Sequence, residues 1–270
     1  MLNGLRLTTP LEREWRRLTR REQALERAAV EAAAPKWRED LESRVPEKVL
    51  AGLQAAFSKG FSLVFQRGSP LLERACRTEE LRQQHQDLDR AVLRYGRRRD
   101  LRKLKGASQR AQLGNLAVTT AEGIGLGALG IGIPDIVIFL GMLLKGVYET
   151  ALHYGFPYDT PRERLLILKM MEAAVSRGPE RKRCNAEVDL LLASDRSPSP
   201  EELQRQLRQT GNAFAAEMLL VKFVQGLPLV GVLGGAANPL YYNRVMRYVQ
   251  LKYQKRYLQG VAKHRGIYLR

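Results

Sequence analysis

The chain has 270 residues, of which 44% are hydrophobic and 27% charged, a composition typical of a folded protein rather than a disordered one. Its 45 basic and 28 acidic residues give a formal net charge of +17, which points to anionic partners. The two cysteines and three widely separated histidines argue against a disulfide framework and against a cysteine-rich metal fold.

The positive charge is concentrated near the two ends of the sequence. Residues 1–110 have a net charge of +10, and residues 241–270 contain eight basic residues and no acidic one. Residues 111–160 between them have a net charge of −3. This layout has three interpretations: attraction to anionic lipid, attraction to nucleic acid, or a solvated arginine-rich surface.

The N-terminal region predicts a helix that docks on the rest of the chain. The first 30 residues lack the apolar run of a signal peptide, so we expect a cytoplasmic protein, or one peripheral on the inner face of the membrane. Residues 10–34 place their apolar side chains on one helical stripe, which Glu22 interrupts and Pro35 ends. The short stripe favours docking on the same chain over a coiled coil.

The following segments also have helical spacing. Helices are expected over residues 46–66, 70–95, 161–176 and 201–224, and in a basic C-terminal segment. Tyr95-Gly96 is expected to break the second of these, and the basic run at residues 97–105 is typical of an exposed helix face. Residues 177–200 are polar and predict a linker with a short docked turn. The absence of long β-alternation predicts an all-α fold.

Two segments rich in glycine and aliphatic residues stand out, at residues 123–147 and 226–237. The first is long enough to cross a bilayer, but its glycines, Pro134 and Asp135 all disfavour a simple spanning helix. A helix from Pro134 to about Tyr154 fits better, with Asp135 near its positive end. Residues 125–130 match G-x-G-x-x-G, but no strand precedes them, which argues against dinucleotide binding.

The candidate lipid- or partner-binding residues come from these segments and from the tail. Asp135 and Asn238 are the polar residues expected to be buried, either as helix caps or as contacts to a lipid head group. Basic residues of the tail alternate with tyrosines, a pattern that suits a membrane interface, single-stranded nucleic acid or a docked helix. The full set is Gly127, Gly130, Pro134, Asp135, Pro228, Gly231, Asn238, Arg244, Arg247, Lys252, Lys255 and Arg256.

The two glycine-rich blocks resemble the EcsC protein family, named for a protein encoded beside a bacterial ABC exporter. The first block runs from Ile133-Pro134-Asp135-Ile136 through Tyr154-Gly155 to Tyr158-Asp159, and the second is Gly226-Leu227-Pro228-Leu229-Val230-Gly231 with Asn238. The resemblance covers about residues 46–260, and Pro239 departs from it. It implies a bacterial, mostly helical, cytoplasm-facing protein with suspected membrane association, and it brings no catalytic residues.

These observations predict one compact helical domain built round the two glycine-rich segments. Residues 1–45 would form an N-terminal helical arm, and residues 46–270 the EcsC-like domain. The expected function is non-enzymatic binding of an anionic membrane surface or a membrane protein, for example as an accessory to a transporter, through basic surfaces and a glycine-rich apolar hairpin. A hydrolase acting on lipid or envelope material is the first alternative, with His153 or converging carboxylates as its signature, and nucleic-acid binding by the tail is the second. The sequence has no metal-ligand or cofactor motif, and no nucleophile motif is present.

Overall fold

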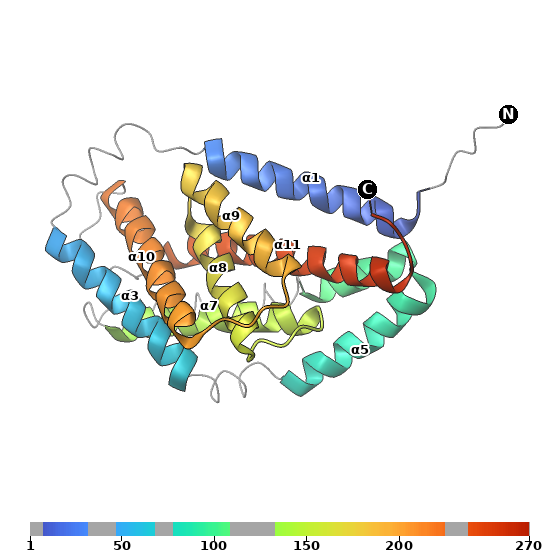
Figure 1. The fold of residues 1–270 in the computed structure, drawn as a ribbon, viewed down its shortest axis with the longest axis horizontal. Coiled ribbons are helices and arrows are strands. Elements are labelled where there is room, and N and C mark those ends of the chain that lie inside the picture. The colour runs from blue at the N-terminus through green and yellow to red at the C-terminus, as the bar shows by residue number, and fades with distance from the viewer. Residues whose placement is uncertain (1–7, 32–46, 68–77, 109–132, 225–236, 270) are drawn as a thin grey trace.

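The structure is a computed structural model that describes residues 8–31, 47–67, 78–108, 133–224 and 237–269. Within these ranges every regular element is an α-helix, which confirms the all-α fold class (Figure 1). A further helix, over residues 98–108, follows the turn at Gly96. The labelled helices are α1 (Pro10–Glu31), α3 (Glu47–Arg67), α5 (Thr78–Tyr95), α7 (Ile133–His153), α8 (Pro161–Val175), α9 (Gly178–Ala193), α10 (Pro200–Val224) and α11 (Ala237–His264).

The helix starts follow local chemistry that the sequence shows directly. Pro161 occupies the first turn of α8, and the hydroxyl of Thr160 accepts a hydrogen bond from the backbone N–H of Glu163. Gly96 separates α5 from the next helix because it adopts a φ of 57°, a conformation that favours glycine. The predicted break at Tyr95-Gly96 is therefore confirmed, as is the helix predicted from Pro134.

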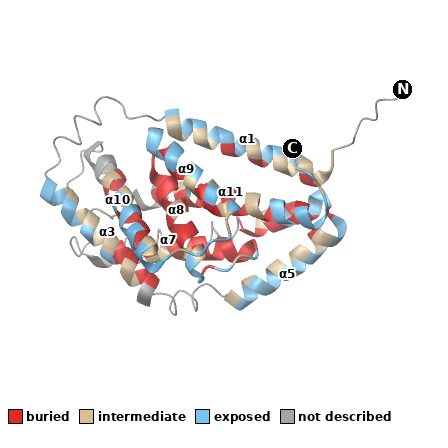
Figure 2. Ribbon diagram, viewed as in Figure 1, coloured by how far each residue is buried: buried red, intermediate tan, exposed pale blue. Residues whose placement is uncertain are grey.

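Helix α8 lies at the centre of the described fold. It packs against α9, α10 and α11, and all its residues from Leu165 to Val175 are buried except Lys169. Figure 2 shows buried residues concentrated in α7, α8 and α11. Helices α3 and α10 pack together at one end of the elongated molecule, α5 lies toward the other end, and α1 runs along α9 and α11 (Figure 1).

The prediction of a polar linker at residues 177–200 was wrong, because most of this segment forms the regular helix α9. The buried positions of α9 are spaced as on any docked helix, but Arg181 and Cys184 stand among them beside Val188 and Leu191. A stripe that buries an arginine cannot be recognised as apolar from the sequence. The buried arginine finds its partners only in the folded chain.

Close helix crossings in the described part of the chain use isolated glycines. A Cβ on Gly211 of α10 would lie 3.0 Å from the backbone nitrogen of Ser58 on α3. A Cβ on Gly146 of α7 would lie 2.6 Å from the hydroxyl of Tyr242 on α11. The glycine-rich stretches at residues 123–132 and 226–236, predicted to form the apolar centre, lie outside the described residues.

Helix α7 is the apolar helix of the described residues. Its segment Ile136–His153 is long and apolar enough to cross a membrane by length and composition. In the fold 72% of this segment is buried, and it packs against α3, α5 and α11. Burial of this kind is what a core helix requires, so the composition of α7 is explained by the fold.

Candidate functional site

Exposed basic side chains gather where α1, the end of α5 with the following helix 98–108, and the end of α11 meet. Glu14 of α1 accepts hydrogen bonds from Lys105 of helix 98–108, at 3.5 Å, and from Gln254 of α11, at 3.2 Å. The guanidinium of Arg265, just after α11, lies so close to Gly96 that a Cβ at residue 96 would collide with it. The segments therefore present one basic surface, which we call the cationic end; its exposed residues are Arg13, Arg16, Arg17, Arg20, Arg21, Arg94, Arg97, Arg98, Arg99, Arg102, Lys103, Lys263 and Arg265.

The acidic residues at the start of α1 and in helix 98–108 are bound by contacts within the chain or are buried. Glu12 accepts a hydrogen bond from the backbone N–H of Thr9 at 2.7 Å and so caps the start of α1. Glu14 is occupied by the contacts just described, and Asp100 is buried. The exposed acid of α1, Glu31, lies at the opposite end of that helix, so the cationic end has a strong positive potential.

Two exposed tyrosines accompany these cations. The side chain of Tyr95 is 49% exposed, and the guanidinium groups of Arg94 and Arg97 lie 5.4 and 4.7 Å from its ring centroid. Tyr268, after α11, is 87% exposed. A ring that is apolar in its body and polar at its tip suits the boundary between water and lipid, where arginine can reach phosphate while its stem covers apolar surface.

A buried lysine joins α1 to α9 and α11. Lys252 of α11 has an exposed fraction of 0%, and its Nζ lies 2.7 Å from carboxylate oxygens of both Glu22 on α1 and Asp189 on α9. Lys255 adds a second ion pair to Glu22 at 2.7 Å. Burial would raise the pKa of Glu22, but the two lysines hold that pKa below its usual value. Glu22 interrupts the apolar stripe of α1 because it meets this pair of cations.

Arg181 of α9 makes a similar contact one helical turn further along α1. It is 2% exposed, and its Nε and Nη2 donate to the two carboxylate oxygens of Glu26 at 3.0 and 2.5 Å. It also donates to the carbonyl of Ala173 and lies over the ring of Tyr248, 4.1 Å from the centroid. The fork geometry of a guanidinium on a carboxylate is the one that arginine also uses on phosphate.

Four of the five predicted tail residues have partners among the described residues. Lys252 and Lys255 are paired with α1 as described, and Arg256 contacts both carboxylate oxygens of Glu163 at 2.9 Å. Arg244 lies 3.2 Å from Glu217. Arg247 is exposed. Three further predicted residues, Pro134, Asp135 and Asn238, lie in the first turns of α7 and α11, and their side chains are not described. The remaining four, Gly127, Gly130, Pro228 and Gly231, lie outside the described ranges.

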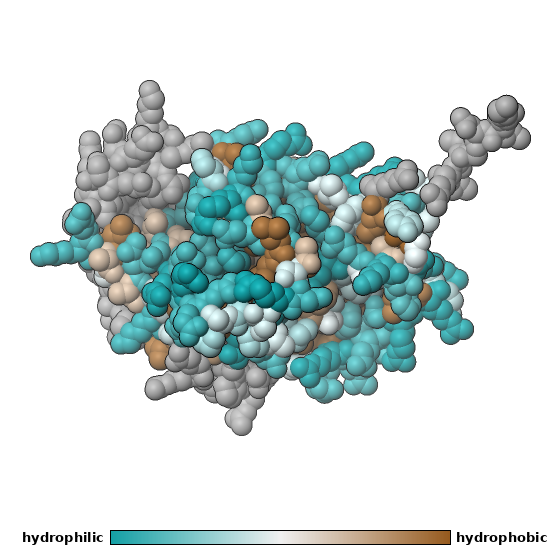
Figure 3. All heavy atoms as spheres, in the orientation of Figure 1, coloured by the Kyte–Doolittle hydropathy of each residue, from teal (hydrophilic) through white to brown (hydrophobic). Residues whose placement is uncertain are grey.

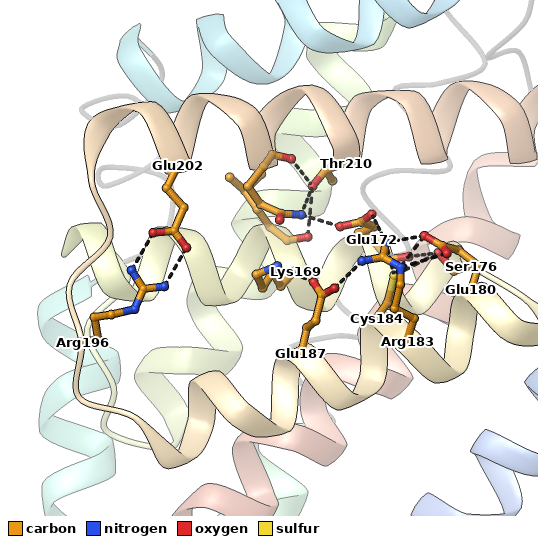
Figure 4. Close-up of polar contacts among 12 residues, drawn as sticks. Lys169, Glu172, Ser176, Glu180, Arg183, Cys184, Glu187, Arg196, Glu202 and Thr210 are labelled. Atoms are coloured by element: carbon orange, nitrogen blue, oxygen red, sulfur yellow. Dashed lines mark hydrogen bonds and ion pairs between the residues drawn. The ribbon is translucent and has the colours of Figure 1, made fainter.

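A second polar cluster lies between α8, α9 and α10 (Figure 4). Ligand atoms of Glu172, Glu180 and Cys184 lie within 4.8 Å of one another, which is close enough to hold a metal ion. The guanidinium of Arg183 already contacts all three, at 2.5 Å from Glu180, 3.7 Å from Glu172 and 3.6 Å from the sulfur. In the described structure the cation of this cluster is therefore Arg183. Arg183 also forms an ion pair with Glu187 on the same helix.

The same cluster does not provide an activated nucleophile. Burial and the nearby Glu172 raise the pKa of the Cys184 thiol to about 12, so the thiol stays protonated near neutral pH. Burial also raises the pKa of Glu172, although a hydrogen bond from Gln206 acts in the opposite direction. This arrangement links α8 to α9 and α10, and it lacks the thiolate that nucleophilic catalysis would need.

His153, the histidine on which the hydrolase alternative depends, is buried at the end of α7. Burial, with a smaller effect from His85, lowers the pKa of His153 to about 4, so its ring is neutral at pH 7. Its backbone carbonyl lies 2.9 Å from Nδ1 of His85, and its Nε2 has no hydrogen-bond partner among the described residues. The described contacts therefore pair it with no serine, threonine or cysteine that it could activate.

The exposed arginines of α1 and helix 98–108 were not among the predicted site residues, although the sequence contained a signal for them. The run at residues 97–105 and the pairs Arg16-Arg17 and Arg20-Arg21 are visible as basic clusters. What the sequence could not show is that the acids among them face inward and that these segments meet the end of α11. Figure 3 shows a mainly hydrophilic face over α1 and α5.

The fold and these surfaces define an all-helical protein with a strongly basic end and charged contacts that bind its first helix to its last. The chain belongs to the EcsC protein family, whose sequence model matches residues 12–258. It is 30% identical over 124 residues to "Protein EcsC" of Bacillus subtilis (strain 168), a match that covers 45% of this chain and 50% of that protein. The matched region thus spans about half the length of this curated relative. No solved structure matches the chain significantly.

Proposed function

We propose that the protein binds anionic lipid at the cytoplasmic face of a membrane through its cationic end, without catalysing a reaction. The observation that supports this proposal is that basic and acidic side chains at this end of the molecule differ in their exposure to solvent. The arginines and lysines that make up the cationic end face solvent, while Glu12, Glu14 and Asp100 have internal contacts or are buried. Each basic residue near an anionic membrane surface contributes about 1 kcal/mol.

The position of the charge supports a defined orientation on the membrane. Helix α10, at the opposite end of the molecule, carries three basic and three acidic residues, so its net charge is zero (Figure 1). An anionic surface would therefore attract the end that contains the start of α1 and helix 98–108. Exposed Tyr95 and Tyr268 would then lie at the depth of the lipid head groups.

Vesicle co-sedimentation tests the proposal. The protein is mixed with neutral vesicles and with vesicles containing anionic lipid, at about 0.1 M and about 1 M salt, where the Debye length falls from about 10 Å to about 3 Å. We expect binding to the anionic vesicles in low salt that is lost in high salt. Absence of binding to anionic vesicles in low salt would remove the proposal. Tight binding to a single-stranded oligonucleotide with none to vesicles would replace it with the nucleic-acid alternative.

A pair of matched variants locates the surface. Arg98→Gln with Arg102→Gln removes two exposed charges from the cationic end, and Arg205→Gln with Arg208→Gln removes two exposed charges from α10. At about 1 kcal/mol each, the first pair should weaken binding about 30-fold. The second pair should have a much smaller effect because those residues lie at the far end. Equal effects of the two pairs would show that only net charge matters.

A further inference from the structure

A second cationic surface lies beneath α1. It consists of Arg181 and Lys252, which both lie over the ring of Tyr248, and of Lys255, which shares Glu22 with Lys252; we call it the covered face. Arg181 and Lys252 are almost completely buried, and the groups that cover them include Glu22 and Glu26 of α1. Three basic residues that the C-terminal half of the chain could offer to an anion are thus already bound by carboxylates.

The carboxylates of α1 occupy positions that phosphate oxygens could take. Lys252 and Lys255 each lie 2.7 Å from Glu22, and Arg181 holds both oxygens of Glu26. These are charge-assisted hydrogen bonds of the kind that the same side chains make to phosphate. An ion pair of this type can be exchanged for another anion with little change in geometry, whereas an apolar contact cannot.

The two faces of α1 differ in a way that favours such an exchange. All six of its arginines are exposed: Arg13, Arg16, Arg17, Arg20, Arg21 and Arg27. Its buried residues are Leu11, Leu18 and Glu22. An anionic membrane would therefore attract α1 from its outer face and would also supply phosphate for the cations that α1 covers.

We propose that α1 is a displaceable cover: an anionic lipid surface draws it off the body, and lipid phosphates replace Glu22 and Glu26 on Arg181, Lys252 and Lys255. This inference rests on the proposed membrane binding. A ligand shifts a conformational equilibrium only as far as its affinities for the two states differ. The open state supplies that difference because it frees Arg181, Lys252 and Lys255 from the carboxylates of α1, although Lys252 keeps its contact with Asp189 of α9.

Distance measurement between two spin labels tests the displacement directly. The labels are placed at Ala28→Cys on α1 and Ala186→Cys on α9, both exposed positions, in the 270-residue chain with its two native cysteines replaced by alanine. We expect one short distance in buffer and with neutral vesicles, and a new longer distance on anionic vesicles. A label pair at Ala186→Cys and Gln209→Cys, on α9 and α10, is the control and should not change.

The outcomes separate the two proposals. If the labelled protein sediments with anionic vesicles and keeps its short distance from α1 to α9, the cover is refuted and the membrane binding stands. If the protein does not bind the vesicles, both proposals fail. A change in the control pair as well would mean that the body unfolds on lipid, which also refutes a displacement of α1 alone.

Charge variants of α1 provide a second test. Glu22→Gln removes the anion shared by Lys252 and Lys255, and Glu31→Gln removes an exposed acid of the same helix as a control with an equal change in charge. One charge near an anionic surface changes affinity by about fivefold. We expect Glu31→Gln to raise vesicle affinity by no more than that, and Glu22→Gln to raise it further, because α1 is then held less tightly. Equal increases would overturn the inference.

Discussion

Replacing the buried lysine of α11 should destabilise the protein strongly. Lys252→Met keeps most of the aliphatic side chain but leaves Glu22 and Asp189 without the cation that lies 2.7 Å from each. Removing one partner of a buried ion pair costs about 3–5 kcal/mol. The lower end applies here, because Lys255 still pairs with Glu22 and the side chain of Asp189 is 42% exposed. We therefore expect a loss of about 3 kcal/mol in the free energy of unfolding.

Urea unfolding followed by circular dichroism measures this loss, and the melting temperature should fall by about 5 °C for a chain of this size. In a Trp37→Phe background, the fluorescence of Trp15, which packs against the core from α1, follows the docking of that helix. Lys182→Met, at an exposed position on α9, is the control and should change the free energy by less than about 0.5 kcal/mol.

The double variant Glu22→Leu with Lys252→Met measures the interaction between these two residues apart from their other contacts. Replacing both members of a buried ion pair by apolar side chains is commonly neutral or stabilising, so most of the stability should return. The coupling free energy should then be at least about 2 kcal/mol. A loss below about 1 kcal/mol for Lys252→Met, as for a surface pair, would refute the reasoning, and so would additivity of the two single changes.

Three further outcomes are expected. The folded-state pKa of His153, about 4, lies below the ordinary 6.5, so the free energy of unfolding should fall by about 3 kcal/mol as the pH drops from 6.5 to 4. Urea titrations at several pH values measure this slope, and His153→Phe should flatten it. Gly211→Val should cost about 1–3 kcal/mol of unfolding free energy, because the backbone of Ser58 is too close to move aside, whereas Gly52→Ala, in open space on α3, should be neutral or stabilising. The thiol of Cys184, in a variant whose other cysteine is serine, should react with iodoacetamide only under unfolding conditions; fast alkylation of the native protein at pH 7.5 would contradict its burial and raised pKa.

Local chemistry made most of the helices predictable from the sequence. Pro10 and Pro161 mark helix starts, and Gly96 marks a turn, because these residues restrict or permit backbone angles wherever they occur. The apolar stripe of α1 was visible for the same reason, since helical spacing depends only on neighbours along the chain. The family resemblance rested on short motifs of this local kind, and the family membership confirms it.

Only the tertiary structure decided which charges are presented to solvent. Lys252 and Glu22 are 230 residues apart in the sequence, so neither could be identified as the other's partner. Helix α9 escaped recognition because its buried stripe includes Arg181, whose burial is tolerable only where Glu26 and the carbonyl of Ala173 accept its hydrogen bonds. The sequence determined how much positive charge the chain carries. Folding determined where it lies, because an ion pair depends on distance in space and a helix start depends on distance along the chain.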